Sequence, residues 1–317
     1  MRVIRRILAV VILGLAALAA ACQGGDGEEV TPPRSPAATD NVAKTITLGD
    51  VSDEPARKVE LFQPVADYLA ANLSEFGIEE GRVVIAPNLE AMAELLRTGV
   101  VDLYFDSAYP TIVVSDLSGS ESILRRWKQG SAEYWSVYFT RKDSGIESRD
   151  DLVGKRIAFE EPFSTSGFVL PAGTLLQRGF KLTPYAHPAD DVAPGEIGYV
   201  FSREDENTLE WVVRGLVSGG ATSNLDYDEL PEELKSQLVI VGKTIAMPRQ
   251  IVSVRPGLDP ELVDKVKDLL MDLDKSDEGR EILRNLKNTR KFDEIPEGTE
   301  ASLRELKALI SQVLLAP

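Results

Sequence analysis

The chain has 317 residues, of which 43% are hydrophobic, and a formal net charge of −16. So acidic a chain is poorly suited to binding nucleic acid, because phosphate contacts need clusters of Lys and Arg. Cys22 is the only cysteine and His187 the only histidine, which excludes an intrachain disulfide and leaves no Cys/His set for zinc. Net charge does not exclude an anionic ligand at a local positive site.

The N-terminus is typical of a bacterial secretory signal. Three arginines among the first six residues precede an unbroken run of apolar and small residues, 7–21, which is shorter than the about 20 residues of a membrane-spanning helix. The run ends Leu-Ala-Ala-Ala-Cys and resembles a lipobox, although Ala19 stands where Leu is usual. We therefore expect a signal peptide, 1–21, and a lipidated Cys22. The alternative is an ordinary secretory signal cleaved nearby.

Residues 22–43 are predicted to form a flexible tether after the lipidated cysteine. They are rich in Gly, Pro, Ser and acids and have no apolar periodicity. The expected location is extracytoplasmic, with the folded part held to a membrane by the N-terminal lipid, in the periplasm or on the outer face of the cell membrane.

From residue 44 onward, short apolar runs alternate with helical patterns. Strands are predicted at 45–48, 83–85 and 100–105, and helices with apolar residues three or four apart at 59–73 and 89–96. This β-α-β-α-β order implies a parallel sheet with helices packed on it.

A second series of the same kind follows. Its predicted strands are 156–159, 198–201, 220–222 and 238–241, its helices are 166–178 and 208–216, and the tail helices are 260–273, 279–286 and 301–315. We expect two α/β lobes with mainly parallel sheets and a cleft at the carboxyl ends of the strands. Lobe 1 would comprise 44–139 plus 250–317 and lobe 2 would comprise 140–249, with hinge crossings near 139–141 and 245–250.

The sharpest functional signal is the run Ser164-Thr165-Ser166-Gly167, which follows a strand and a Pro-containing turn and opens onto a helix. Three hydroxyls can donate to an oxyanion, and the N–H groups of a first helical turn have no helical partner. The helix dipole adds attraction, and Gly167 allows a close approach to the backbone. The run predicts an anion site that needs no Lys or Arg. The alternative is that one hydroxyl merely caps the helix.

Five pieces around this run resemble a known family in their order and spacing. They are Lys-Asp-Ser-Gly-Ile at 142–146, Asp-Leu-Val-Gly-Lys at 151–155, the hydroxyl run at 164–167, Pro171, and Leu-Leu-Gln-Arg-Gly at 175–179. The pattern is similar to the phosphate-, phosphite- and phosphonate-binding proteins of ABC importers, which have the type II periplasmic-binding-protein fold. The resemblance extends over 45–317 and is most specific over 133–180.

The resemblance implies further ligand contacts. Tyr109 matches a family Tyr whose hydroxyl reaches the ligand, although Asp106 and Ser107 replace the usual Gly-Pro; plain packing is the alternative. Before the helix at 208–216 the family commonly has a His followed by an acid. Here Asp205 takes the place of the His and Glu206 is the acid.

Acids at a helix start are favoured by the dipole in any case. A carboxylate beside an oxyanion is repulsive unless the ligand brings a P–OH proton or an ammonium group. If Asp205 and Glu206 face the cleft, they therefore select protonated or amino-bearing ligands. Asn224 follows a strand where the family places polar ligand contacts, and a turn-forming role is its alternative.

The resemblance implies the substrate-binding component of an ABC importer, which closes its lobes on a small phosphonate, phosphite or phosphate and delivers it to a membrane permease. We expect a monomer without cofactor, metal or catalytic residues, because no nucleophile–base pair or metal cluster is evident. Two alternatives stay open: a sensor that reports to a membrane kinase, and the same fold with another ligand such as a sulfonate.

Overall fold

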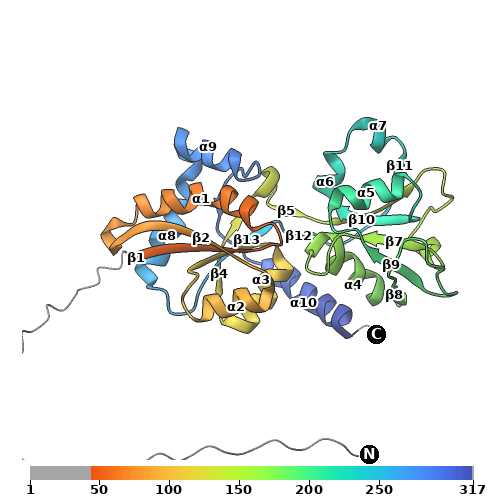
Figure 1. The fold of residues 1–317 in the computed structure, drawn as a ribbon, viewed down its shortest axis with the longest axis horizontal. Helices are drawn as coiled ribbons and strands as arrows, with labels where there is room; N and C mark the ends of the chain where they lie inside the picture. Colours follow the sequence, from red (N-terminus) through yellow and green to blue (C-terminus); the bar gives the residue numbers. More distant parts are fainter. Residues whose placement is uncertain (1–43, 316–317) are drawn as a thin grey trace, which may run out of the picture. The chain divides into compact units, whose positions relative to one another are not determined.

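Two six-stranded sheets, joined by a two-stranded ribbon, form the frame of the protein (Figure 1). The structure, a computed structural model, describes residues 44–315. The predicted signal peptide, the lipidated Cys22 and the tether up to residue 43 lie outside the described residues. Among the helices of residues 44–315, none is long and apolar enough to cross a membrane.

The first sheet has the strand order β14-β4-β13-β3-β1-β2 and, with its helices, forms lobe 1. Its strands are β1 (Lys44–Val51), β2 (Ile78–Ala86), β3 (Leu103–Asp106), β4 (Glu121–Arg126), β13 (Gln250–Val254) and β14 (Phe292–Asp293). Its helices are α1 (Pro55–Ala71), α2 (Leu89–Arg97), α3 (Ala108–Ser118), α8 (Pro260–Asp272) and α9 (Asp277–Asn285). β1 pairs in parallel with β2 and β3, whereas β13 runs antiparallel between β3 and β4.

The second sheet has the strand order β11-β6-β10-β7-β9-β8 and forms lobe 2. Its strands are β6 (Ser136–Arg141), β7 (Arg156–Phe159), β8 (Leu182–Pro184), β9 (Ile197–Phe201), β10 (Gly219–Ser223) and β11 (Leu238–Lys243). Its helices are α4 (Leu170–Gln177), α5 (Asp205–Val213), α6 (Asn224–Asp228) and α7 (Glu232–Lys235). β7 is parallel to β9 and β10, and β6 is antiparallel to β10 and β11. β8 is also parallel to β9, so the second sheet is mainly parallel as predicted, whereas the first sheet has more antiparallel than parallel pairs.

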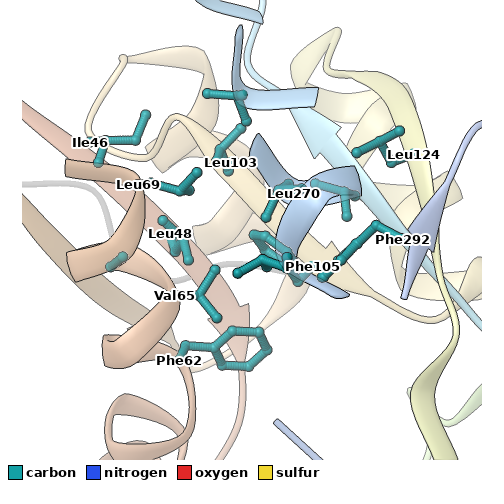
Figure 2. Close-up of a cluster of buried hydrophobic side chains, with 14 of the residues drawn as sticks. Ile46, Leu48, Phe62, Val65, Leu69, Leu103, Phe105, Leu124, Leu270 and Phe292 are labelled. Atoms are coloured by element: carbon teal, nitrogen blue, oxygen red, sulfur yellow. The ribbon is translucent and has the colours of Figure 1, made fainter. Parts of the chain in front are cut away.

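Apolar side chains of α1, α8 and the strands form the core of lobe 1 (Figure 2). On α1 the buried residues Phe62, Val65 and Leu69 recur every three or four positions, so they form one face of the helix. That face packs closely on the sheet at Gly81, because a Cβ there would lie 2.2 Å from the carbonyl oxygen of Ala66. This packing positions the N-terminal end of α1 near the carboxyl end of β1.

The chain crosses between the lobes at the ribbon formed by β5 (Glu133–Tyr134) and β12 (Met247–Pro248), which pair antiparallel. The first crossing precedes β6, which pairs entirely within the second sheet. It therefore lies closer to the N-terminus than the predicted 139–141, and residues 136–139 belong to lobe 2. The second crossing lies inside the stretch 245–250.

The C-terminal helix α10 (Thr299–Leu315) contacts both lobes, although the prediction placed it in lobe 1 alone. It packs on α3 of lobe 1 and on α4 of lobe 2. Gly173 of α4 allows the helices to approach, because a Cβ at that position would lie 2.7 Å from the Cβ of Leu309. Helix α10 therefore contacts the ribbon strand β12 and one helix of each lobe.

Candidate ligand-binding site

A cleft of about 1270 Å³ lies between the lobes, next to the carboxyl ends of β1, β3, β7 and β10. The helices that follow these strands begin at this edge, so residues at or beside the N-termini of α1, α3, α5 and α6 line the cleft. Helix N-termini carry partial positive charge and unpaired N–H groups. The fold thus surrounds the cleft with several weakly positive poles.

The run Ser164-Thr165-Ser166 lies on the lobe 2 side of this cleft, and Gly167 lies just behind the lining. These residues begin a π-helical turn, Thr165–Val169, that leads into α4. Ser164 Oγ accepts a hydrogen bond of 2.9 Å from the N–H of Gly167, so Ser164 caps the turn as well as lining the cleft. A Cβ at Gly167 would lie 2.5 Å from Glu160 Oε2, so only glycine fits between the turn and that carboxyl.

Two backbone donors of this turn are free. No acceptor within residues 44–315 meets the N–H of Thr165 or of Ser166. The Ser166 side chain is 9% exposed and lines the cleft. The two free N–H groups and the Ser166 hydroxyl are thus donors at the start of this helical turn, where the sequence predicts an anion site.

The hydroxyl of Thr165 joins the two lobes. Thr165 Oγ1 donates to Ser107 Oγ at 2.9 Å and accepts from the N–H of Tyr109 at 3.0 Å. Ser107 and Tyr109 form the N-terminal end of α3. The side chain of Tyr109 packs among apolar residues and does not line the cleft.

Tyr134 of the ribbon supplies a donor that the sequence analysis did not identify. Its side chain is 0% exposed, it lines the cleft, and its hydroxyl has no hydrogen-bond partner within residues 44–315. Burial raises the pKa of Tyr134, and the charge of Arg249 and then the nearby hydroxyls of Thr165 and Ser166 oppose that rise. A buried hydroxyl without a hydrogen-bond partner is costly, so Tyr134 stands out among the residues that line the cleft.

A cationic wall formed by Arg126, Lys128 and Arg249 lies at the ribbon side of the cleft. Arg126 donates to Gln250 Oε1 at 2.5 Å, to Thr289 Oγ1 and to a backbone carbonyl, so its charge is held by the protein. Arg249 lies 4.5 Å over the ring of Tyr134. In lobe 1, Lys58 and Asp50 also line the cleft and form an ion pair of 2.7 Å.

Carboxyl groups of lobe 2 form the opposite wall. Glu160, Asp205 and Asp226 line the cleft together, from the end of β7, the start of α5 and the helix α6. Burial, with smaller contributions from Glu161 and Asp226, raises the pKa of Glu160 to about 7. The pKa of Asp205 rises well above its usual value through burial and then the charges of Glu160 and Asp226.

Asp205 is held in place by the hydroxyl of Thr222, which donates to its Oδ1 at 2.7 Å. Glu206, its predicted companion, also lines the cleft but is exposed. Asn224 is placed differently: it is buried, its Oδ1 accepts from the N–H of Trp135 at 2.9 Å, and it is absent from the cleft lining. The structure therefore brings Asp205 and Glu206 to the cleft with the hydroxyl run, but not Asn224 or Tyr109.

The raised pKa of Glu160 gives a testable pH dependence of stability. A carboxyl that titrates at about 7 when folded and at about 4.5 when unfolded contributes stability that is full below about pH 4.5 and is lost as pH rises through about 7. We expect the melting temperature of the unliganded protein to fall between pH 5 and about pH 7. In Glu160→Gln this fall should be smaller, as measured by thermal denaturation in matched buffers. An unchanged slope would contradict the burial of this charge.

Two α/β lobes with mixed sheets, two crossing strands and a polar cleft between them define a periplasmic binding protein of type II. Residues 49–297 match the family described as "ABC transporter, phosphonate, periplasmic substrate-binding protein", and the chain belongs to this family. The family accounts for a small ligand, a permease partner and a location outside the cytoplasm. Within residues 44–315 there is no group of three or more His, Cys, Asp or Glu side chains that could hold a metal ion.

Relatives of known name and structure agree with this assignment. The chain is 24% identical over 266 residues to the phosphonates-binding periplasmic protein of Escherichia coli, which covers 80% of this chain and 73% of the relative. It is 26% identical over 263 residues to the phosphate-import protein PhnD of Mycolicibacterium smegmatis, covering 80% and 77%. The structure of XAC2383 from Xanthomonas citri bound to chloride has a TM-score of 0.80 and 29% identity, covering 85% of this chain and 98% of that one.

Proposed function

We propose that the protein captures a small phosphonate that carries an amino group, closes its lobes on it, and presents it to the permease of an ABC importer. One observation carries this proposal: the cleft combines a hydroxyl-and-amide anion site with a cluster of half-buried carboxyls on the same wall. The anion site favours a negatively charged group and the carboxyls favour a positively charged one. A zwitterion, which carries both, can satisfy the two at once.

The anion half would hold the phosphonyl group. Its donors are the hydroxyls of Ser164 and Ser166, the free N–H groups of Thr165 and Ser166, and the unpartnered hydroxyl of Tyr134. A phosphonyl group has three oxygens, each able to accept more than one hydrogen bond. Helix-start amides and hydroxyls are a recurrent way to bind such an anion.

The acid half would hold the amino group. In the empty cleft Glu160, with a pKa of about 7, keeps its proton in part at neutral pH, and burial and the neighbouring acids raise the pKa of Asp205 as well. An ammonium group favours their ionised forms, since an opposite charge a few ångströms away stabilises a carboxylate. A ligand without an amino group, such as phosphate or phosphite, gains no ion pair with these acids and needs them protonated, so it should bind more weakly.

Closure around the ribbon would bring both lobes onto the ligand. The two crossing strands are short, and Thr165 already joins the start of α3 to the hydroxyl run. The lobes would then rotate about β5 and β12, with α10 packed behind them. Lipidation of Cys22 remains part of the proposal, and mass spectrometry of the mature N-terminus tests it.

Calorimetric titration with four matched ligands tests the function. They are 2-aminoethylphosphonate, its near-isostere propylphosphonate, phosphate, and taurine, which replaces the phosphonyl group by a sulfonate. We expect 2-aminoethylphosphonate to bind about 100-fold or more tightly than each of the others, a difference of about 2.7 kcal/mol. Equal binding of propylphosphonate would reject the role of the acids, tightest binding of taurine would make the ligand a sulfonate, and a preference for phosphate would make it phosphate.

A further inference from the structure

A strained segment of lobe 1, residues 127–130, enters the cleft between β4 and β5. Gln129 has a φ of 55°, in the left-handed region that a side chain disfavours. It packs on the segment after α9, where Lys287 (φ 53°) and Asn288 (φ 48°) are left-handed as well. Such residues cost on the order of 1–3 kcal/mol each and persist only where the surroundings enforce them.

Backbone hydrogen bonds enforce this conformation. The N–H of Gln129 donates to the carbonyl of Lys287 at 3.1 Å, and the N–H of Gly130 donates to that of Asn288 at 3.1 Å. The Gln129 side chain is fixed at both ends, because it accepts from Arg249 at 2.6 Å and donates to Asp226 Oδ1 at 3.0 Å. The segment is thus held rigidly in one geometry beside the cleft.

The residue that this geometry presents to the cleft is Lys128. Its side chain lines the cleft, and its ammonium group forms no ion pair or hydrogen bond within residues 44–315. The two neighbouring guanidinium groups donate to neutral side chains, Arg126 to Gln250 and Arg249 to Gln129, and Arg249 Nε has no partner within residues 44–315. Lys128 is therefore the cation of this wall whose charged group makes no hydrogen bond to the described residues, so its whole ammonium group can meet a ligand.

The surroundings of Lys128 carry both signs of charge. The charged groups that face it are Arg126 of β4, Arg249 of the ribbon segment and Lys58 of α1, and, from lobe 2, Asp226 of α6, Glu160 after β7 and Asp205 of α5. Burial, then the three cations, lowers the pKa of Lys128 to about 7. An unpaired ammonium in this place is unfavourable until an anion joins it.

We propose that Lys128 pairs with the phosphonyl group of the ligand and makes the cleft prefer a doubly charged phosphonyl over a singly charged sulfonyl group. The proposal deepens the function above and rests on it. Hydroxyl and amide donors serve both kinds of oxyanion, whereas a full cation gains more from the group with the larger charge. On binding, the amine takes a proton from solvent at Nζ and becomes the ammonium partner of the anion.

The test compares Lys128→Met and Lys128→Arg with the wild type, using 2-aminoethylphosphonate and taurine. Lys128→Met should weaken 2-aminoethylphosphonate binding about 30-fold or more and reduce its advantage over taurine by about 10-fold. Lys128→Arg should keep most of the affinity but lose its pH dependence, because a guanidinium stays charged. The ratio of wild-type to Lys128→Arg affinities should therefore fall between pH 7 and about pH 9, by at most about tenfold per pH unit. That ratio cancels the titration of the ligand itself.

Lys155→Met is the matched control, since Lys155 is an exposed lysine of lobe 2 that does not line the cleft. It should bind both ligands as the wild type does. Thermal denaturation separates binding from folding: Lys128→Met should melt no lower than the wild type, because it removes an unpaired, half-buried cation. Wild-type affinity in Lys128→Met, or a flat wild-type to Lys128→Arg ratio, would overturn the role of Lys128. A wild type that binds no phosphonate would instead overturn the proposed function.

Discussion

Ser166→Asp is expected to abolish capture of 2-aminoethylphosphonate, with a loss of affinity of about 1000-fold or more, which corresponds to about 4.1 kcal/mol. Ser166 is largely buried at the cleft surface and begins a turn whose N–H groups are free. A carboxylate at this position would accept from those N–H groups itself and would repel the phosphonyl group at short range. Calorimetric titration measures the loss directly.

Three variants separate the effect of the added charge from the loss of a hydroxyl and from a change in stability. Ser74→Asp adds the same charge at the start of a short helix in lobe 1, away from the cleft lining, and should leave binding unchanged. Ser166→Ala removes only a hydroxyl and should cost roughly tenfold in affinity. Ser164→Ala should also lower stability by about 1 kcal/mol, because Ser164 caps the turn through Gly167. Wild-type affinity in Ser166→Asp would place the anion elsewhere.

The sequence predicts the regular elements around the site well, because their signals are local. The strand predicted at 156–159 coincides with β7, and the helix predicted at 166–178 corresponds to the π-helical turn and α4 together. The hydroxyl run could be located because a strand, a turn and a helix start follow one another within a few residues. Its dual use, with Ser164 as cap and Thr165 as a contact to lobe 1, depends on distant residues and could not be predicted.

The charged residues of the site could not be predicted from local sequence patterns. Glu160 and its neighbour Glu161 look like an ordinary solvated acid pair in the sequence. Glu160 is half-buried because Gly167 leaves room for its carboxyl and because α5 and α6 bring Asp205 and Asp226 beside it. Tyr134 and Lys128 were missed for a related reason: the first crossing was predicted near 139–141, so the ribbon segment that carries them was not expected in the cleft wall.

The mixed character of the sheets has the same origin. Periodicity identifies a strand but not its direction, and β6 and β13 run antiparallel to their neighbours where the chain crosses between the lobes. These two strands follow the ribbon directly. Their direction is thus a consequence of the crossing, and the crossing determines which side chains meet at the hinge side of the cleft.

The second large effect is expected in the acid wall. Asp205→Asn should weaken 2-aminoethylphosphonate about 100-fold, while propylphosphonate should bind as well as before or better. The physical reason is that Asp205 and Glu160 offer a cluster of negative charge to an ammonium and the same cluster repels a ligand that has none. Glu210→Gln, an exposed acid further along α5, is the control and should change neither affinity. Unchanged selectivity in Asp205→Asn would remove the acids from the site.

The pH profile links this wall to the cationic one. Below about pH 7 Glu160 keeps its proton in the empty cleft, so an ammonium must displace it and affinity for 2-aminoethylphosphonate should fall as the solution becomes more acidic. Above about pH 7 Lys128 loses its proton, so affinity should fall again. Binding should therefore be strongest near neutral pH. Glu160→Gln should remove only the acid limb and Lys128→Arg only the alkaline limb. A profile in which one substitution flattens both limbs would mean that a single shared proton, rather than two opposed charges, controls capture.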